Sequence, residues 1–215
     1  MKVTDFKNGI LLFEYPDAKS LGTAFVRVQE FYENPNPKFR GQYFKFIDFK
    51  KWYSKHFGKG KFTYFTDYEG YNIPGEVVDK FVDLYFWEAL HPTELKLLDK
   101  TVKSSRHEGK YYVIGAIKGH SGTINHELSH AFFHLYPGYR KAVKTLLKRH
   151  KFTDIKRYLT AKMYSKEVFE DEIAAYLMFD AALLESEEID TEKYNQTAMD
   201  LHKLFKKYVA LHMPK

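Results

Sequence analysis

The sequence predicts an α+β fold in a single domain that spans residues 1–215. Hydrophobic residues make up 44% and charged residues 29% of the 215 positions, which is the balance of a globular chain with a substantial core. Strand-like and helical patterns alternate in the first half, whereas the second half is helical throughout. No linker or internal repeat interrupts the chain. We therefore expect short N-terminal strands and helices followed by a mostly helical C-terminal half.

Short apolar runs and helical periodicity define the elements of the first half. Strands are expected at residues 10–15, 42–46, 61–66 and 111–117. Helices are expected from Ser20, as the capping residue, to the break at 34–37, and then at 48–57, 75–90 and 92–102. The segment 67–74 is rich in turn residues and is expected to be a loop.

The second half contains five helical segments. The first is capped by Thr123 and ended by Pro137, and the others follow at 139–150, 153–163, 166–185 and 191–212. Ser165 is the expected cap of the segment 166–185, whose apolar residues recur at helical spacing.

The first of these helices carries the sequence His126-Glu127-Leu128-Ser129-His130, an H-E-x-x-H motif. Residues four apart lie on one face of a helix, so His126 and His130 are placed to bind a single metal ion. Glu127 lies beside them, within reach of a water on that ion. The motif predicts metal-assisted hydrolysis, in which the metal acidifies the water and the carboxylate takes and returns its proton. A helix whose histidines only form hydrogen bonds is the alternative.

A catalytic zinc ion needs a third protein ligand, and the chain has no cysteine to supply it. His134 lies about 12 Å along the helix from His126, too far for one ion to reach both. Glu172 falls inside the apolar arc of the segment 166–185, whereas Glu170 lies at its margin and Asp171 outside it. Because a carboxylate that faces the core requires a cation or a metal, Glu172 is the expected third ligand, with His134 and His150 as the next candidates.

The HELSHAFFH segment followed by the helical EDEIAAY segment resembles the zincin metallopeptidases of the gluzincin type, over roughly residues 111–184. This resemblance implies a zincin-like fold and one zinc ion per chain, held by His126, His130 and Glu172. It also implies Glu127 as the general base of a zinc metallopeptidase that hydrolyses a protein or peptide substrate. The chain departs from the family in its 42-residue gap between His130 and Glu172 and in Tyr176, which stands where an acidic residue is usual.

Residues around the expected zinc site are less well determined by the sequence. The oxyanion of the reaction needs a donor, for which His120, Tyr139 and Tyr164 are candidates. Asp180 lies on the apolar arc and either orients a ligand histidine or bonds a neighbouring side chain at the helix boundary. The segment 111–118 is expected to be an edge strand that pairs with the substrate chain, or else an ordinary core strand.

The formal net charge of +6 allows an acidic partner. Lysine-rich tracts occur at 50–51, 141–151 and 203–207, and we expect them to be solvated helix faces because the lysines lie opposite apolar stripes. A catalytically inactive zincin-like module that binds nucleic acid or another acidic partner is the alternative function. No signal peptide or transmembrane segment is evident, so no membrane partner is expected and the cytoplasm is the default location, with export by another route left open.

Overall fold

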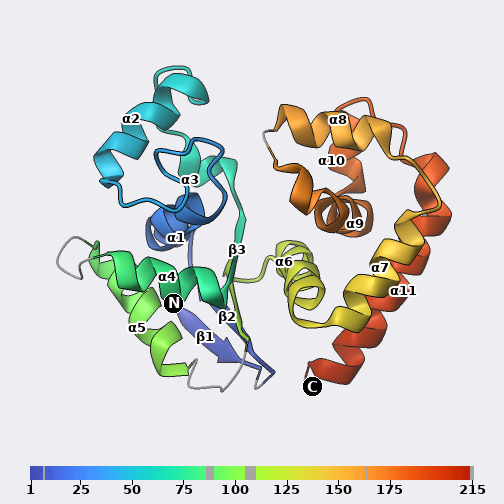
Figure 1. The fold of residues 1–215 in the computed structure, drawn as a ribbon, viewed down its shortest axis with the longest axis horizontal. Helices are drawn as coiled ribbons and strands as arrows, with labels where there is room; N and C mark the ends of the chain where they lie inside the picture. The colour runs from blue at the N-terminus through green and yellow to red at the C-terminus, as the bar shows by residue number, and fades with distance from the viewer. Residues whose placement is uncertain (7, 86–89, 105–109, 163, 214–215) are drawn as a thin grey trace. The chain divides into compact units, whose positions relative to one another are not determined.

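The computed structural model describes residues 1–6, 8–85, 90–104, 110–162 and 164–213, and it confirms the α+β class (Figure 1). The chain forms two compact units, Met1–Ile124 and Asn125–Lys215, each described here by itself. The expectation of one domain for residues 1–215 stays a prediction.

The first unit contains a four-stranded sheet in the order β1-β2-β4-β3. Its strands are β1 (Lys2–Asp5), β2 (Ile10–Tyr15), β3 (Gly70–Pro74) and β4 (Tyr112–Ile117). β2 and β4 are parallel, with Leu12 opposite Ile114, and both outer pairs are antiparallel. The two central strands read as continuous apolar runs because nearly all their residues are buried.

The prediction that segment 111–118 forms an edge strand is wrong. β4 pairs with β2 on one side and with β3 on the other, so its backbone donors and acceptors are already used within the sheet. The edges of the sheet are β1 and β3. β4 therefore has no unpaired edge to which the backbone of a substrate strand could add.

Among the described residues of this unit, five α-helices accompany the sheet: α1 (Ala18–Glu33), α2 (Phe46–His56), α3 (Tyr64–Asp67), α4 (Gly75–Leu84) and α5 (Pro92–Ser104). α1 packs closely on β4 because Gly115 has no side chain. A Cβ at that position would lie 2.5 Å from the ring of Phe25. The N-cap of α1 is Asp17, whose carboxylate accepts the Ser20 N–H at 2.7 Å, so the prediction of Ser20 as the cap is wrong.

Three other predictions for this unit are wrong, and tertiary contacts explain the differences. No strand forms at 42–46, where the Phe44 N–H donates to the Tyr85 hydroxyl instead of to a neighbouring strand. The alternating segment 61–66 gives way to α3, which places Tyr64 in the core with no exposed surface. The expected loop 67–74 contains β3, and β1 was not predicted.

Aromatic side chains form much of the core of the first unit. The ring of Phe49 lies within 5.3–5.7 Å of the rings of Phe39, Tyr53 and Tyr64. The pairs of Phe49 with Phe39 and with Tyr64 are edge-to-face, an arrangement that stabilises a core beyond the area that it buries. Core packing of this kind accounts for part of the aromatic content of 18%.

The second unit is helical, and its helices are α6 (Ser121–Leu135, which begins just before the boundary), α7 (Pro137–Leu147), α8 (Thr153–Ala161), α9 (Phe169–Phe179), α10 (Ala181–Ser186) and α11 (Asn195–His212). α7 and α11 lie side by side, and α9 packs against both (Figure 1). Phe132 of α6 is fully buried against Phe205 of α11 and Tyr139 of α7. α6 ends before Pro137, as predicted, because the residue before a proline disfavours the helical conformation.

Two details of the second unit differ from expectation. Thr123 lies inside α6 and does not cap it. The expected helix 166–185 consists of a 3-10 turn (Lys166–Val168), α9 and α10, and it is broken at Asp180, where φ is −129° and ψ is 30°. In the first unit, α4 ends at Leu84 and Tyr85 is extended, so the expected helix 75–90 is shorter than predicted. Residues 86–89 and 163, which belong to two expected helices, lie outside the described residues. Across the described ranges, no helix is both long and apolar enough to span a bilayer.

Candidate metal centre

The two histidines of the motif lie one turn apart on α6, and their rings face the same region. Their ring centroids are 4.9 Å apart and their planes are inclined by 63°. The side chain of His130 is 2% exposed and that of His126 is 17% exposed. Burial of two imidazoles at this spacing gives α6 a recessed pair of nitrogen donors.

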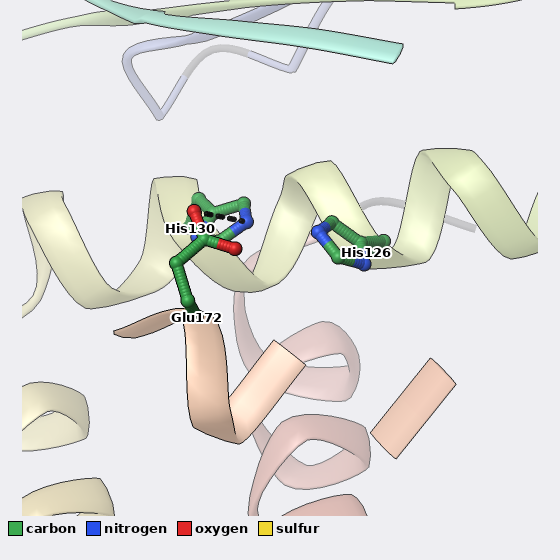
Figure 2. Close-up of side chains that lie close together, drawn as sticks. All are labelled: His126, His130 and Glu172. Atoms are coloured by element: carbon green, nitrogen blue, oxygen red, sulfur yellow. Dashed lines mark ion pairs between the residues drawn. The ribbon is translucent and has the colours of Figure 1, made fainter. Parts of the chain in front are cut away.

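Glu172 reaches the same region from α9. Figure 2 shows its carboxylate directed toward the imidazoles, and its Oε1 lies 3.9 Å from Nε2 of His130. One ligand atom each from His126, His130 and Glu172 lies within 4.8 Å of the other two. The structure therefore brings together the three residues that the sequence analysis selected as ligands.

This group of atoms fits a zinc ion. Two imidazole nitrogens and one carboxylate oxygen are the donor set of many catalytic zinc sites, and donors bonded to one tetrahedral ion lie about 3.4 Å apart. The described structure therefore needs only small side-chain adjustments to reach that spacing. In addition, Oε2 of Glu172 is buried and has no hydrogen-bond partner among the described residues. A buried carboxylate oxygen without a donor is costly unless a cation is bound to it.

Each histidine is held through its other ring nitrogen by an aspartate. Nδ1 of His130 lies 3.0 Å from Oδ2 of Asp171, and Nδ1 of His126 is hydrogen-bonded to Oδ2 of Asp180. Because Nδ1 donates to a carboxylate, the neutral form of each ring presents Nε2 as its free acceptor. When the rings are neutral, these contacts favour the tautomer that leaves Nε2 to a metal.

Of these two aspartates, the sequence predicted a role beside a ligand histidine for Asp180 but not for Asp171. The helical wheel placed Asp171 outside the apolar arc, and its side chain is indeed 19% exposed. Its position directly before the expected ligand Glu172 gave no signal, because adjacent residues of a helix do not share a face.

The carboxylates around the site alter the protonation of its residues. Burial opposes the charged form of His130, but the charges of Asp171 and Glu172 outweigh it and raise its pKa well above the ordinary value. Burial also raises the pKa of Glu172 to about 7, against the opposing effect of the two histidines. Without a metal, the site therefore retains protons near neutral pH that a cation would displace.

Glu127, the expected general base, is 6% exposed on α6 beside His126. Burial opposes the charged forms of His126 and His130, and the charge of Glu127 is one of several that raise the pKa of both rings. Glu127 does not belong to the three-donor group. Glu127 therefore lies on α6 directly after His126 without being one of the three expected donors.

The three candidate oxyanion donors lie in different surroundings. The Tyr164 hydroxyl lies 3.5 Å from that of Tyr176, whose ring packs edge-on against His126 at 5.7 Å. Tyr139 is 1% exposed in the helical core, and its hydroxyl has no hydrogen-bond partner among the described residues. His120 lies in the first unit, 3.8 Å from Glu69. Within the second unit, Tyr164 is the candidate connected to the metal site.

The remaining histidines considered as ligands lie elsewhere. His150 packs against the rings of Phe152 and Tyr194, 5.4 and 5.1 Å away, and His134 is not part of the donor group.

No protein-family model matches this chain, and comparisons with curated proteins and with solved structures found no significant match.

Proposed function

We propose that this protein is a zinc-dependent metallopeptidase, a hydrolase with a zincin-like arrangement of ligands. The observation that carries the proposal is the buried group of His126, His130 and Glu172, in which Glu172 retains an oxygen without a partner. Asp171 and Asp180 hold the two imidazoles with Nε2 free, as the outer residues of catalytic zinc sites do.

A zinc ion bound to these three residues would lower the pKa of its water ligand to about 7 and polarise the substrate carbonyl. Glu127, the second residue of the motif, accepts the proton of the attacking water and delivers it to the leaving amine. Its burial beside two imidazoles favours this role, because a base that is shielded from bulk water keeps the proton in the site.

The hydroxyl pair of Tyr164 and Tyr176 is the proposed source of a hydrogen bond to the oxyanion. Tyr176 contacts His126 through its ring and Tyr164 through its hydroxyl, so Tyr176 links the Tyr164 hydroxyl to the first expected ligand. A tyrosine donor at this position would stabilise the negative charge that develops on the carbonyl oxygen. Tyr176 thus occupies the position of the family's usual acidic residue with a different role, while Asp180 supplies the carboxylate for His126.

The test is peptide hydrolysis by zinc-loaded protein. The wild type and the Glu127→Gln variant, both loaded with one equivalent of zinc, are incubated with a proteome-derived peptide pool, and new termini are identified by mass spectrometry. We expect the wild type to create new termini and Glu127→Gln to retain zinc while its rate falls by about 100-fold or more. Equal cleavage by both proteins, or none by the zinc-loaded wild type, would contradict the proposal. Loss of zinc from the variant would make Glu127 a ligand.

A further inference from the structure

The positive charge of the chain is concentrated in one segment of the first unit. Residues 38–61 contain eight lysine and arginine residues and one acidic residue, Asp48, a formal net charge of +7. The remaining residues contain 26 basic and 27 acidic side chains, so the whole excess of the chain, +6, originates in this segment. We define the α2 basic surface as the eight basic residues of the segment, all exposed: Lys38, Arg40, Lys45, Lys50, Lys51, Lys55, Lys59 and Lys61.

These cations have no acidic partners within the described part of the chain, whereas other lysine-rich tracts do. Among the described residues, no ion pair includes a member of the α2 basic surface. In the C-terminal tracts, by contrast, Lys144 lies 2.8 Å from Glu170, and Arg149 and Lys203 lie 2.5 and 3.8 Å from Asp200. We therefore expect the C-terminal tracts, rather than the α2 basic surface, to be ordinary solvated helix faces.

α2 and the turn after it shape this surface into a hollow. Phe49 and Tyr53 point from α2 into the core, and the opposite face carries the basic side chains. An open hollow of about 570 Å³ is lined by Ile47, Lys50, Lys51, Ser54, Lys55, Lys59 and Gly60.

The turn that closes the hollow has a fixed geometry. The Gly60 N–H donates to the Ser54 carbonyl at 2.8 Å, which returns the chain to α2 and places Lys59 beside it. Gly58 is required because a Cβ there would lie 1.7 Å from the Lys61 carbonyl oxygen, and Lys59 itself has a φ of 49°. The cations are therefore arranged around a recess by the backbone and do not simply project from a flexible tail.

The chemistry of the surface favours nucleic acid over the other large anions. Protein interfaces are depleted in lysine at their centres, whereas nucleic-acid interfaces are strongly positive. Insertion into an anionic membrane needs a free apolar helix face, but the apolar face of α2 is already packed in the core. Tyr43 and Phe57, which flank α2, are 42% and 44% exposed, and exposed aromatic rings among cations suit the stacking of unpaired bases.

We propose that the α2 basic surface binds single-stranded nucleic acid. The lysines of the hollow contact successive phosphates, and Phe57 and Tyr43 stack on bases at its margins. This binding is independent of the proposed peptidase site, which lies in the other unit.

The proposal is tested by fluorescence anisotropy with a labelled oligothymidylate of about 20 nucleotides, long enough for the usual site sizes. The triple variant K50Q/K51Q/K55Q removes three charges from the hollow. The matched control, K203Q/K206Q/K207Q, removes three exposed charges from α11. Circular dichroism verifies that both variants remain folded.

We expect the wild type to bind with an affinity that falls steeply with salt, with a logarithmic slope of about −3 if four phosphates are contacted. The hollow variant should lose at least about 10-fold in affinity and about two units of that slope, while the control stays within about twofold of the wild type. Glu127→Gln should bind as the wild type does.

Several results would overturn the proposal. These are the absence of salt-dependent binding, equal losses in the two triple variants, and tighter binding of a duplex of the same length. Equal affinity for polyglutamate, or for vesicles that contain phosphatidylserine, would show a surface that attracts any anion, and the assignment to nucleic acid would be wrong.

Discussion

The Nδ1 atom of His130 lies 3.0 Å from Oδ2 of Asp171, the residue directly before Glu172 on α9. Glu172 lies 3.9 Å from Nε2 of the same ring. Two consecutive residues of α9 therefore face the two nitrogens of one imidazole. Asp180, at the end of α9, holds the other histidine. α9 and its C-cap therefore contribute one expected ligand and both of the groups that orient the histidines.

Asp171→Asn and Asp180→Asn should each weaken zinc binding by about 10- to 100-fold. An amide at either position no longer stabilises the Nδ1-protonated ring, so the metal-binding tautomer loses its support. Competition titration with a zinc chelator measures the change. Asp190→Asn, an exposed residue of the same unit, serves as the control and should leave the affinity unchanged. Wild-type affinity in both site variants would show that these contacts do not orient the ligands.

Tyr164→Phe should lower kcat by about 100-fold while zinc content stays at the wild-type level, because its hydroxyl belongs to the pair beside His126. Tyr139→Phe is the matched control. Its hydroxyl is buried and has no hydrogen-bond partner among the described residues, so its removal should leave kcat unchanged and stability undiminished. Steady-state kinetics on an identified peptide distinguishes the two variants. The opposite pattern would assign the oxyanion donor to Tyr139.

The expected ligands follow from local rules. Four-residue spacing places His126 and His130 on one face, and the apolar periodicity of the later helix indicated that Glu172 is buried; it is 6% exposed. Asp171 was missed because a helical wheel describes one helix, and the partner of this residue lies on another. Which side of α9 faces α6 depends on tertiary packing, which periodicity does not encode.

Tertiary contacts also decided the fold where the pattern failed. The alternation at 61–66 favours a strand, but burial of Tyr64 and a 2.6 Å hydrogen bond from Thr63 to Asp67 stabilise a helical turn. The segment at 70–74 has turn residues, yet its pairing with β4 makes it an edge strand of the sheet. β4 pairs with β3, about 40 residues before it, and with β2, about 100 residues before it, so its central position was not predictable from its own residues.

Glu30→Gln should stabilise the protein at alkaline pH. Burial raises the pKa of Glu30 to about 7 from an ordinary 4.5, although a hydrogen bond from Asn34 opposes the shift. The folded state therefore binds this proton more tightly than the unfolded chain does. Protonated Glu30 therefore adds up to about 3 kcal/mol to the free energy of unfolding. This contribution is complete below the pKa of Glu30 in the unfolded chain, and it is lost as the pH rises through the pKa of Glu30 in the folded state.

Urea denaturation of wild type and Glu30→Gln at about pH 5 and about pH 8 measures this effect. The variant should gain stability relative to the wild type between the two pH values. Glu76→Gln, an exposed carboxylate of the same unit, should follow the wild-type profile. A parallel pH dependence of wild type and Glu30→Gln would refute the assignment.

The measurement that tests the central claim most directly is the zinc content of purified, reconstituted protein, determined by elemental analysis together with chelator competition. The wild type is compared with Glu172→Ala, with Glu170→Ala as a control two residues away whose side chain is 50% exposed, and with His134→Ala. We predict about one zinc ion per chain in the wild type and in both controls, and a sharp loss of affinity in Glu172→Ala alone. A wild type that binds no zinc, or a Glu172→Ala variant that binds it as tightly as the wild type, would contradict the proposed metal centre.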